Sequence, residues 1–377
     1  MIQTEKIAIA SVGNDAAEFA DFTKQEQAGL RRAGEILKAG GLVAFPTETV
    51  YGLGGDALNP DSSRKIYAAK GRPSDNPLIV HIADWGDLSR IASRIPEEAR
   101  KLAEAFWPGP LTMILQKSDA VPPETTGGLD TVAVRMPAHP VALAMIREGG
   151  GFVAAPSANT SGKPSPTLAA HVAEDMDGRI DMIIDGGALG IGLESTIVDL
   201  TVLPPRILRP GYITREMLER VLGTVESDAT ILQSQTECGQ APKAPGMKYR
   251  HYAPAGELAV VCGEPERVVE YINRRADEDR GAGHRVGVIG TEETLGRYRA
   301  DLVKSVGSRT DEAAIAARLY AILREFDREG ATRIYSEAFS AEGLGQAIMN
   351  RLLKAAGHRV IDLETQKEDG ERDSNRK

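Results

Sequence analysis

The stretch KGRPSDNPLIVHI, residues 70–82, joins two predicted elements of secondary structure. The residues just before it, DSSRKIYAAK (61–70), have the spacing of a short helix. The run PLIVHI (77–82) is short and apolar, as in a buried strand. Gly71 permits a turn between the two, and the proline that follows Arg72 favours an extended backbone there. A helix, a turn and a buried strand in this order indicate an α/β fold.

Short apolar runs of this kind alternate with helical patterns from residue 41 to residue 222. The strand candidates are LVAF (42–45), PLIVHI (77–82), LTMILQK (111–117), TVAVRM (131–136), FVAAPS (152–157), DMIID (181–185) and STIVDL (195–200). Helices between some of these strands imply parallel pairs, whereas short links such as PPETTGGLD (122–130) allow antiparallel pairs. We therefore expect a mixed sheet.

The pattern changes after residue 222. About thirty polar residues with prolines and glycines follow, and loops of that length are usually linkers or functional lids. A second alternation of strands and helices then predicts a small Rossmann-like α/β domain. Its first turn, CGEPER (262–267), lacks the glycines of a dinucleotide site. The predicted parts are a catalytic domain at 23–222, a linker and active-site lid at 223–256, a C-terminal domain at 257–363 and a charged tail at 364–377.

Composition limits the class of protein. With 377 residues, 42% of them hydrophobic and 26% charged, the chain is long enough for two or three globular domains. A net charge of −9 argues against nucleic-acid binding over the whole surface, so any polyanion must meet a local cluster of cations. Two cysteines are too few for a disulfide framework or a zinc knuckle. No run approaches the roughly 20 apolar residues of a membrane helix. We expect a soluble, cytoplasmic protein with no membrane contact.

Lys70 and Arg72 are the first candidate functional residues. The chain has no Walker loop, no HExxH motif and no nucleophile elbow, so a bound nucleotide would need another device. In an extended segment Lys70 and Arg72 point to one side, and two such cations suit a triphosphate. The alternative is that they only neutralise the end of the helix and decorate the surface.

Two strands place polar side chains on one face. In the runs 77–82 and 131–136, apolar side chains alternate with His81 in the first, and with Thr131 and Arg135 in the second. An arginine at the centre of a strand is costly to bury without an anion or a carboxylate partner. A lone histidine in a strand is more often a packed residue than a ligand, so His81 has both readings.

Two loops have unusual composition. In FVAAPSANTSGKPSPT (152–167), Ser157 and Asn159 are two residues apart, so both can reach the same ligand from an extended segment; the alternative is a plain loop. In PTETVYGLGGDA (46–57), Thr47 and its polar neighbours precede a dense group of glycines, which predicts tight turns; the alternative is a ligand pressed against the backbone.

Nine motifs occur in one order along the chain: PTETVYGLG, KGRPSDNPLIVHI, WPGPLT, TVAVRMP, APSAN, SPT, ESTIVDL, LRPG and APGMKYRHYAP. By these motifs the chain resembles the L-threonylcarbamoyladenylate synthase family in its long two-domain form, whose catalytic part is the YrdC-like domain. The resemblance covers residues 30 to 360 or so and includes an unbroken KxR…SxN pairing.

The resemblance implies a fold and a reaction. The fold is a twisted mixed α/β sheet with a concave, positively charged cavity, followed by the smaller Rossmann-like domain. The reaction joins L-threonine, bicarbonate or CO2, and ATP into threonylcarbamoyl-AMP and pyrophosphate, for the N6-threonylcarbamoyladenosine modification of tRNA. ATP is then a substrate that brings Mg2+ with it, and the protein itself has no metal site. The expected partner is the threonylcarbamoyl transferase machinery, with weak tRNA binding as a further expectation.

The same resemblance assigns site residues. The threonine pocket falls on Thr47, His81, Arg135, the backbone of Ala155, and Ser195. The ATP contacts fall on Lys70, Arg72, Asn76, Thr131, Ser157, Asn159, Ser165, Arg209 and Tyr252. Lys70 and Arg72 are also the candidate catalytic residues, since no protein nucleophile is needed and the phosphate charge must be neutralised.

Two alternatives remain at this point. A positively charged cavity of this kind could belong to a non-catalytic module that binds tRNA or double-stranded RNA. A carbamoyl-transfer role of the hydrogenase-maturation kind would call for zinc-finger cysteines, and the chain has only Cys238 and Cys262.

Overall fold

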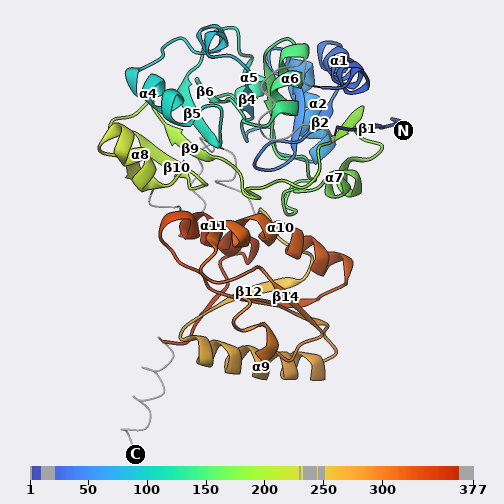
Figure 1. The fold of residues 1–377 in the computed structure, drawn as a ribbon, viewed down its shortest axis with the longest axis vertical. Coiled ribbons are helices and arrows are strands. Elements are labelled where there is room, and N and C mark those ends of the chain that lie inside the picture. The colour runs from blue at the N-terminus through green and yellow to red at the C-terminus, as the bar shows by residue number, and fades with distance from the viewer. Residues whose placement is uncertain (1, 10–21, 229–230, 232–243, 245–250, 365–377) are drawn as a thin grey trace, which may run out of the picture. The chain divides into compact units, whose positions relative to one another are not determined.

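A computed structural model describes residues 2–9, 22–228, 231, 244 and 251–364 (Figure 1). The described residues form two compact units: 2–9, 22–161, 165–228, 231 and 244 in the first, and 162–164 and 251–364 in the second. Much of the predicted linker and nearly all of the predicted tail lie outside the described residues.

The first unit is built on one mixed sheet. Its strands are β1 (Glu5–Ala8), β2 (Val43–Phe45), β3 (Gly52–Asp56), β4 (Ile79–His81), β5 (Leu111–Gln116), β6 (Thr131–Arg135), β7 (Val153–Ala155), β8 (Met182–Asp185), β9 (Thr196–Asp199), β10 (Arg206–Arg209) and β11 (Glu226–Ser227). They lie in the order β1-β8-β2-β3-β7-β4-β6-β5-β9-β10-β11. Parallel pairs such as β4–β6 and β5–β9 alternate with antiparallel pairs such as β4–β7 and β5–β6, so the prediction of a mixed sheet is confirmed.

Helices pack on both faces of this sheet. They are α1 (Lys24–Lys38), α2 (Pro60–Lys70), α3 (Leu88–Ile91), α4 (Glu97–Phe106), α5 (Pro123–Thr126), α6 (Pro140–Glu148), α7 (Ala169–Met176) and α8 (Arg215–Leu222). Apolar residues of α1 and α6 share one core cluster with β2, β7 and β8, while α2, α4, α7 and α8 contribute to the cluster on the other face. The face of the sheet that α1 and α6 cover extends beyond these helices over β4, β6, β5, β9 and β10.

Local sequence sets where these helices begin and end. Thr23 caps α1 in a reciprocal pair with Glu26, whose carboxylate accepts a hydrogen bond from the Thr23 N–H at 2.9 Å. Helix α2 ends at Gly71, which adopts a left-handed conformation with φ 62°, as a residue without Cβ can. The Arg72 N–H then donates to the Tyr67 carbonyl at 2.9 Å. The turn predicted between helix and strand is therefore present.

Strand β3 corrects the prediction of tight turns in the glycine-rich stretch 52–55. The glycines form a strand because neighbouring side chains come too close for any larger residue. A Cβ on Gly54 would lie 2.8 Å from Val153 Cγ1 and 3.0 Å from the Phe45 ring. Dense glycine here reflects close packing within the sheet rather than chain reversal.

Replacing Gly54 with alanine is expected to lower the free energy of unfolding by about 1–3 kcal/mol, because the added methyl group overpacks the sheet. Gly190 is a matched control, since no atom lies within 4 Å of a Cβ built there and its φ is not positive. Urea unfolding of the two variants measures the difference. Equal stability of the two alanine variants would show that β3 tolerates a side chain.

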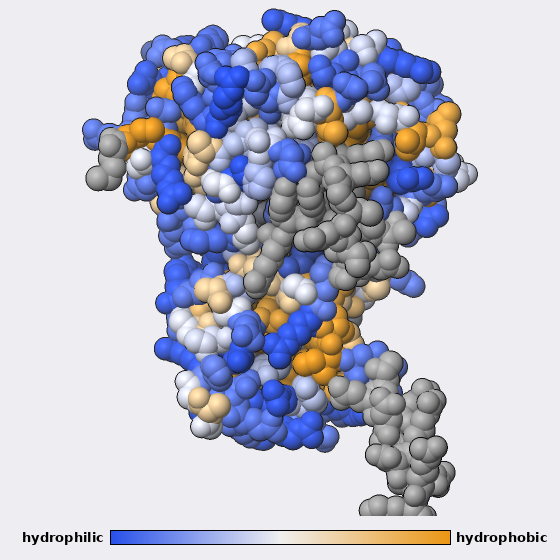
Figure 2. All heavy atoms as spheres, turned by 180° about the vertical axis from the view of Figure 1, so that it is seen from behind, coloured by the Kyte–Doolittle hydropathy of each residue, from blue (hydrophilic) through white to orange (hydrophobic). Residues whose placement is uncertain are grey.

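Most large apolar side chains are buried. Among the described residues, the exposed ones are Ile2, Leu203, Tyr212 and Val360, and on the face drawn in Figure 2 the first unit is mainly hydrophilic. No helix in the described ranges combines the length and apolar composition needed to cross a membrane.

The second unit has an all-parallel sheet. Its strands, β12 (Glu257–Cys262), β13 (Val286–Gly290), β14 (Leu302–Ser305), β15 (Arg333–Glu337) and β16 (Val360–Asp362), lie in the order β14-β13-β15-β12-β16. Helix α9 (Pro265–Gly281) covers one face, and α10 (Glu312–Arg328) and α11 (Gly343–Ala355) cover the other (Figure 1). The prediction of a Rossmann-like domain is confirmed.

Candidate active site

The centre of the first sheet brings three predicted threonine-site residues onto neighbouring strands. Strand β4 lies between β7 and β6, and His81 is paired with Arg135 across the parallel β4–β6 ladder. Ile79 is paired with Ala155 on the other side. The predicted alternation of side chains along β4 and β6 is correct. Ile79 and Ala133 belong to a small apolar cluster on one face, whereas the valines that alternate with them in the sequence, Val80, Val132 and Val134, belong to the main core.

Arg135 is buried and has the carboxylate partner that its position in a strand requires. Its exposed fraction is 4%, and its Nη2 lies 2.7 Å from Glu48 Oε1. The Nε–H donates to the Gly109 carbonyl at 3.2 Å, and Nη1 donates to Thr49 Oγ1 at 2.9 Å. The guanidinium is therefore fixed in orientation from two sides.

Thr47 belongs to the same hydrogen-bond network. Its hydroxyl donates to the Val50 carbonyl at 2.8 Å and lies 2.8 Å from the Thr49 hydroxyl, which in turn accepts from Arg135. Both threonines are buried. The segment 47–51, which follows β2, therefore contacts the Arg135 guanidinium on β6 through the Thr49 hydroxyl. Hydrogen bonds within the segment hold that hydroxyl in place.

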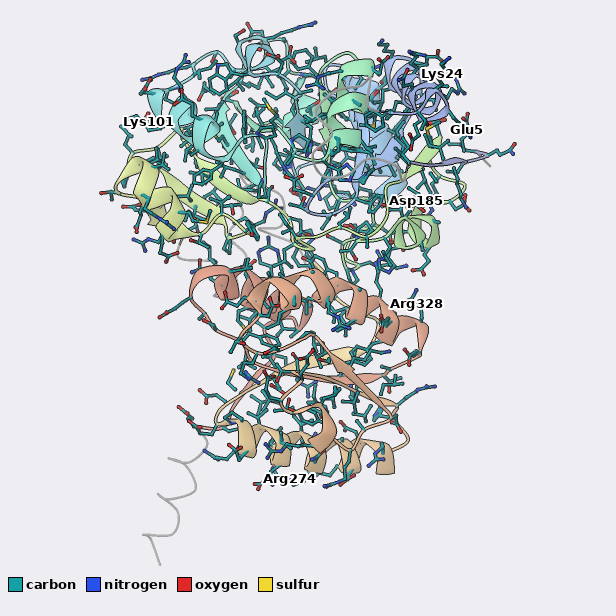
Figure 3. All side chains as sticks on the ribbon, in the orientation of Figure 1. Glu5, Lys24, Lys101, Asp185, Arg274 and Arg328 are labelled. Atoms are coloured by element: carbon teal, nitrogen blue, oxygen red, sulfur yellow. The ribbon has the colours of Figure 1, made fainter. Side chains whose placement is uncertain are left out.

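The loop after β8 forms hydrogen bonds with the segment 47–51. Asp185, labelled in Figure 3, ends β8, and the Tyr51 hydroxyl donates to the Gly187 carbonyl at 2.8 Å. The Ile191 N–H donates to the Glu48 carbonyl at 3.1 Å. The backbone that carries Glu48 is therefore anchored at both ends of the turn.

His81 is neutral in the folded protein. Burial, and next the positive charge of Arg135, lower its pKa to about 3. Its Nδ1 lies 3.1 Å from the Ile79 carbonyl oxygen, which can only accept, so this hydrogen bond forms in the tautomer that carries its proton on Nδ1. A neutral imidazole beside a fixed arginine suits a hydroxyl group better than a second anion.

The pH dependence of stability should report this histidine. In the unfolded chain its pKa is near 6.5, so below that pH the unfolded state binds a proton that the folded state does not. Between pH 7 and pH 5 this group is expected to remove about 2 kcal/mol of stability. The variant His81→Asn keeps a donor for the Ile79 carbonyl but has no side chain at this position that titrates in this range. Its free energy of unfolding, measured with urea, should therefore fall by about 2 kcal/mol less between pH 7 and pH 5 than that of the wild-type protein. Parallel pH curves for the two proteins would contradict the assignment.

A hydroxyl pair connects β5 to the residue just before β9, and Arg209 of β10 donates to the same pair. Thr112 Oγ1 lies 2.8 Å from Ser195 Oγ, and Thr112 is paired with Arg135 across the β5–β6 ladder. Arg209 at the end of β10 donates from Nη2 to Ser195 Oγ at 3.2 Å and from Nε to the Ser195 carbonyl at 3.0 Å. A continuous row therefore runs across five neighbouring strands, from His81 through Arg135 and Ser195 to Arg209.

Lys70 ties the end of α2 to the polar loop after β7. The buried ammonium donates to the carbonyl oxygens of Ser157 and Asn159, both at 2.5 Å. The Ser157 hydroxyl donates to Asn159 Oδ1 at 2.5 Å, and the Ser161 N–H donates to the Lys70 carbonyl at 2.8 Å. In this structure Lys70 orders the loop that carries two of the predicted ATP contacts.

Arg72 and Asn76 lie on the turn that leads into β4. Arg72 donates from Nε to the Asn76 carbonyl at 3.2 Å and from Nη2 to the Pro77 carbonyl at 3.1 Å. Asn76 is buried, and its Oδ1 accepts no hydrogen bond from any described group. Thr131 begins β6 and is partly exposed. The turn therefore offers a partly buried cation and an amide oxygen that lacks a donor.

Two further predicted ATP residues have different surroundings. The Ser165 hydroxyl donates to Glu194 Oε1 at 2.5 Å, and both residues are buried. Tyr252 belongs to the second unit, where its ring packs 5.2 Å from that of Tyr320 and 5.6 Å from that of His251. Its φ of 65° is left-handed, and its side chain is buried. The expectation that Tyr252 reaches a nucleotide stays a prediction.

Sequence reasoning assigned no role to Glu48, Thr49, Thr112 or Glu194. Glu48 and Thr49 stand in a motif that was noted for its polar residues, yet only the fold shows that both face Arg135. Thr112 is the one hydroxyl in the apolar part of β5. The signal that could have found it is the alternation of the strand, which places Thr112 on the same face as Ile114. In the described part of the chain, no group of three or more His, Cys, Asp and Glu side chains is placed to hold a metal ion.

The fold and this polar face define a class of protein. It is an α/β protein whose mixed sheet gathers buried cations and hydroxyl groups on one face. Residues 35–211 match a family described as Telomere recombination. Residues 213–357 match a family described as Threonylcarbamoyl-AMP synthase, C-terminal domain.

Known proteins match over almost the whole chain. Threonylcarbamoyl-AMP synthase of Bacillus subtilis is 53% identical over 333 residues, which cover 88% of this chain and 94% of that protein. Threonylcarbamoyl-AMP synthase of Pyrococcus abyssi is 50% identical over 334 residues, covering 89% and 96%. A crystal structure of P. abyssi Sua5 complexed with L-threonine has a TM-score of 0.86 at 46% identity and covers 96% of this chain and 100% of that chain. The chain belongs to the threonylcarbamoyl-AMP synthase family, as its motifs predicted.

Proposed function

We propose that the protein is a threonylcarbamoyl-AMP synthase that uses L-threonine, bicarbonate or CO2, and ATP. Membership of the family over both units supports this function. The observation that carries it within the structure is the row from Arg135 through Ser195 to Arg209, which places two buried cations on one face of one sheet. One cation can hold a carboxylate while the other holds phosphate oxygens.

The chemistry requires positioning more than a protein nucleophile. The threonine amine combines with CO2 to give a carbamate, whose oxygen attacks the α-phosphate of ATP while pyrophosphate leaves. Two anions must therefore be held close together and their charge neutralised. We assign threonine binding to Thr47, His81, Arg135, Ala155 and Ser195, and phosphate binding to Lys70, Arg72 and Arg209, with Mg2+ carried by the nucleotide.

The remaining ATP contacts are assigned to the polar loops and strand ends around this face. They are Asn76, Thr131, Ser157, Asn159, Ser165 and Tyr252. The buried Lys70 ammonium supports the assignment of Ser157 and Asn159, because it holds their backbone in place. Asn76 Oδ1, a buried acceptor without a described donor, suits an exocyclic amine or a ribose hydroxyl.

We assign the linker, 223–256, the role of a lid over this face. Ala244 is completely buried in the same apolar cluster as Ile79, Ala133 and Ile197, which supports a linker that covers the site. A cover would exclude water from a labile acyl adenylate during the reaction. The product would then pass to the threonylcarbamoyl transferase machinery in the cytoplasm.

Release of pyrophosphate tests the function. Purified full-length protein is supplied with ATP, bicarbonate and each of the common amino acids in turn. The expected result is pyrophosphate release that requires all three substrates and is fastest with L-threonine. Salt-sensitive RNA binding without threonine-dependent pyrophosphate release would contradict the function and favour the RNA-binding module.

A further inference from the structure

The Glu48 carboxylate is short of hydrogen-bond donors. Both of its oxygens are buried, and no group in the described ranges donates an aligned hydrogen bond to either of them. A carboxylate has about four acceptor positions, and buried acceptors are normally satisfied. Glu48 Oε1 lies 2.7 Å from Arg135 Nη2, so the two form an ion pair by distance without a well-directed hydrogen bond.

Arg135 is short of acceptors in the same place. Of its five N–H groups, one donates to Gly109 and one to Thr49, and Nη2 has no aligned acceptor. Because Gly109 and Thr49 already fix the guanidinium, Glu48 is not needed to orient it. The Arg135 guanidinium and the Glu48 carboxylate therefore face each other. In the described structure, Arg135 Nη2 has no aligned acceptor and the two Glu48 oxygens have no aligned donor.

The other titratable neighbour does not neutralise Glu48. Burial lowers the pKa of His139, and this outweighs the Glu48 charge, which raises it. The imidazole is therefore mostly neutral, and its buried Nδ1 has no hydrogen-bond partner among the described groups. Arg135 is the only charged group that the described residues place against the Glu48 carboxylate.

We propose that Glu48 binds the α-ammonium group of the amino-acid substrate while Arg135 binds its carboxylate. The inference rests on the function proposed above. An amino acid carries a cation and an anion one carbon apart, and the Glu48–Arg135 pair offers the complementary charges at contact distance. The ammonium supplies the donors that Glu48 lacks, and the carboxylate supplies the acceptors that Arg135 lacks. Thr47, next in the chain, lies beside the same pair.

Selectivity for an ammonium group follows from this arrangement. A ligand with a hydroxyl in place of the ammonium would leave the buried Glu48 charge without a cation. It would also bring a second carboxylate close to Glu48. A site built for a charged donor rejects the analogue that lacks it, because its own polar groups are then left unpaired.

Calorimetry with two ligands tests the proposal. Full-length protein in bicarbonate-free buffer is titrated with L-threonine and with the matching 2,3-dihydroxybutanoate, which has a hydroxyl in place of the ammonium. The wild-type protein should bind threonine at least about tenfold more tightly. In Glu48→Gln, threonine should bind about 10–100-fold more weakly, while the dihydroxy acid should bind as well as before or better. Glu35→Gln, the same change at an exposed residue of α1, should leave both affinities unchanged.

The outcomes separate the inference from the function on which it rests. Equal weakening of both ligands in Glu48→Gln would mean that Glu48 only supports Arg135 and would overturn the proposal. Equal affinity of the wild-type protein for both ligands would also overturn it and needs no variant. If the wild-type protein neither binds threonine nor releases pyrophosphate with it, the proposed function fails first and the inference falls with it.

Discussion

Replacing Arg135 with methionine is expected to lower the free energy of unfolding of the first unit by about 3–5 kcal/mol and to abolish measurable turnover. The guanidinium is buried, and its removal leaves the Glu48 carboxylate without a counter-ion in the interior. The Gly109 carbonyl also loses its donor. Turnover is lost because the amino acid no longer has a cation for its carboxylate. Urea unfolding and pyrophosphate release measure the two effects.

A second variant identifies the source of the instability. In Arg135→Met with Glu48→Gln, no unpaired charge remains in the interior, so about half or more of the lost stability should return while turnover stays absent. Arg32→Met removes an exposed arginine that also pairs with two carboxylates, and the unfolding midpoint should not move. If the double variant is no more stable than Arg135→Met, a buried unpaired carboxylate is not the cause.

Replacing Arg72 with alanine is expected to lower kcat/KM for ATP about 10²–10³-fold, because a fixed cation is lost from the phosphates in the transition state. The guanidinium is held by the carbonyls of Asn76 and Pro77 in the turn before β4, whereas the predicted threonine-binding residues Arg135 and Ser195 lie on β6 and just before β9. Threonine affinity measured by calorimetry should therefore change less than about threefold. Initial rates at varied ATP concentration give the main result.

A neighbouring arginine provides the control for this change. Arg64 lies on α2, is exposed and pairs with Asp61 and Glu124. Replacing Arg64 with alanine should leave kcat and the KM for ATP unaltered. A rate loss in Arg64→Ala similar to that in Arg72→Ala would indicate a general effect of charge on nucleotide approach. Unchanged ATP kinetics in Arg72→Ala would remove this residue from the catalytic set.

The sequence was sufficient for the main features of the fold. Apolar runs of four to seven residues marked β2, β4 to β9, and the helices between some of them implied the parallel pairs. Strand β3 could not be found in this way, because its glycines carry no periodicity and their reason is the closeness of Val153 and Phe45. Strand β1 (EKIA) also escaped, because its four residues, which pair with β8, are mostly exposed and include only two apolar side chains.

The candidate site was predictable where a residue type is costly in its place, as Arg135 is at the centre of a strand. The motifs then supplied its companions through the resemblance. Contacts between distant segments were not predictable, and the Lys70 ammonium is an example: its two carbonyl partners lie 87 and 89 residues further along the chain. Glu48 was visible in its motif, but its unfilled acceptor positions are a property of the folded interior.

The row of residues across the sheet also bears on how the protein is made. Thr47, His81 and Arg135 leave the ribosome well before Ser195, which precedes β9, and Arg209, which ends β10, complete the row. A nascent chain that stops short of residue 195 therefore lacks the final part of the proposed site. Substrate binding that needs both Ser195 and Arg209, as proposed, can stabilise this unit only once synthesis has passed β10.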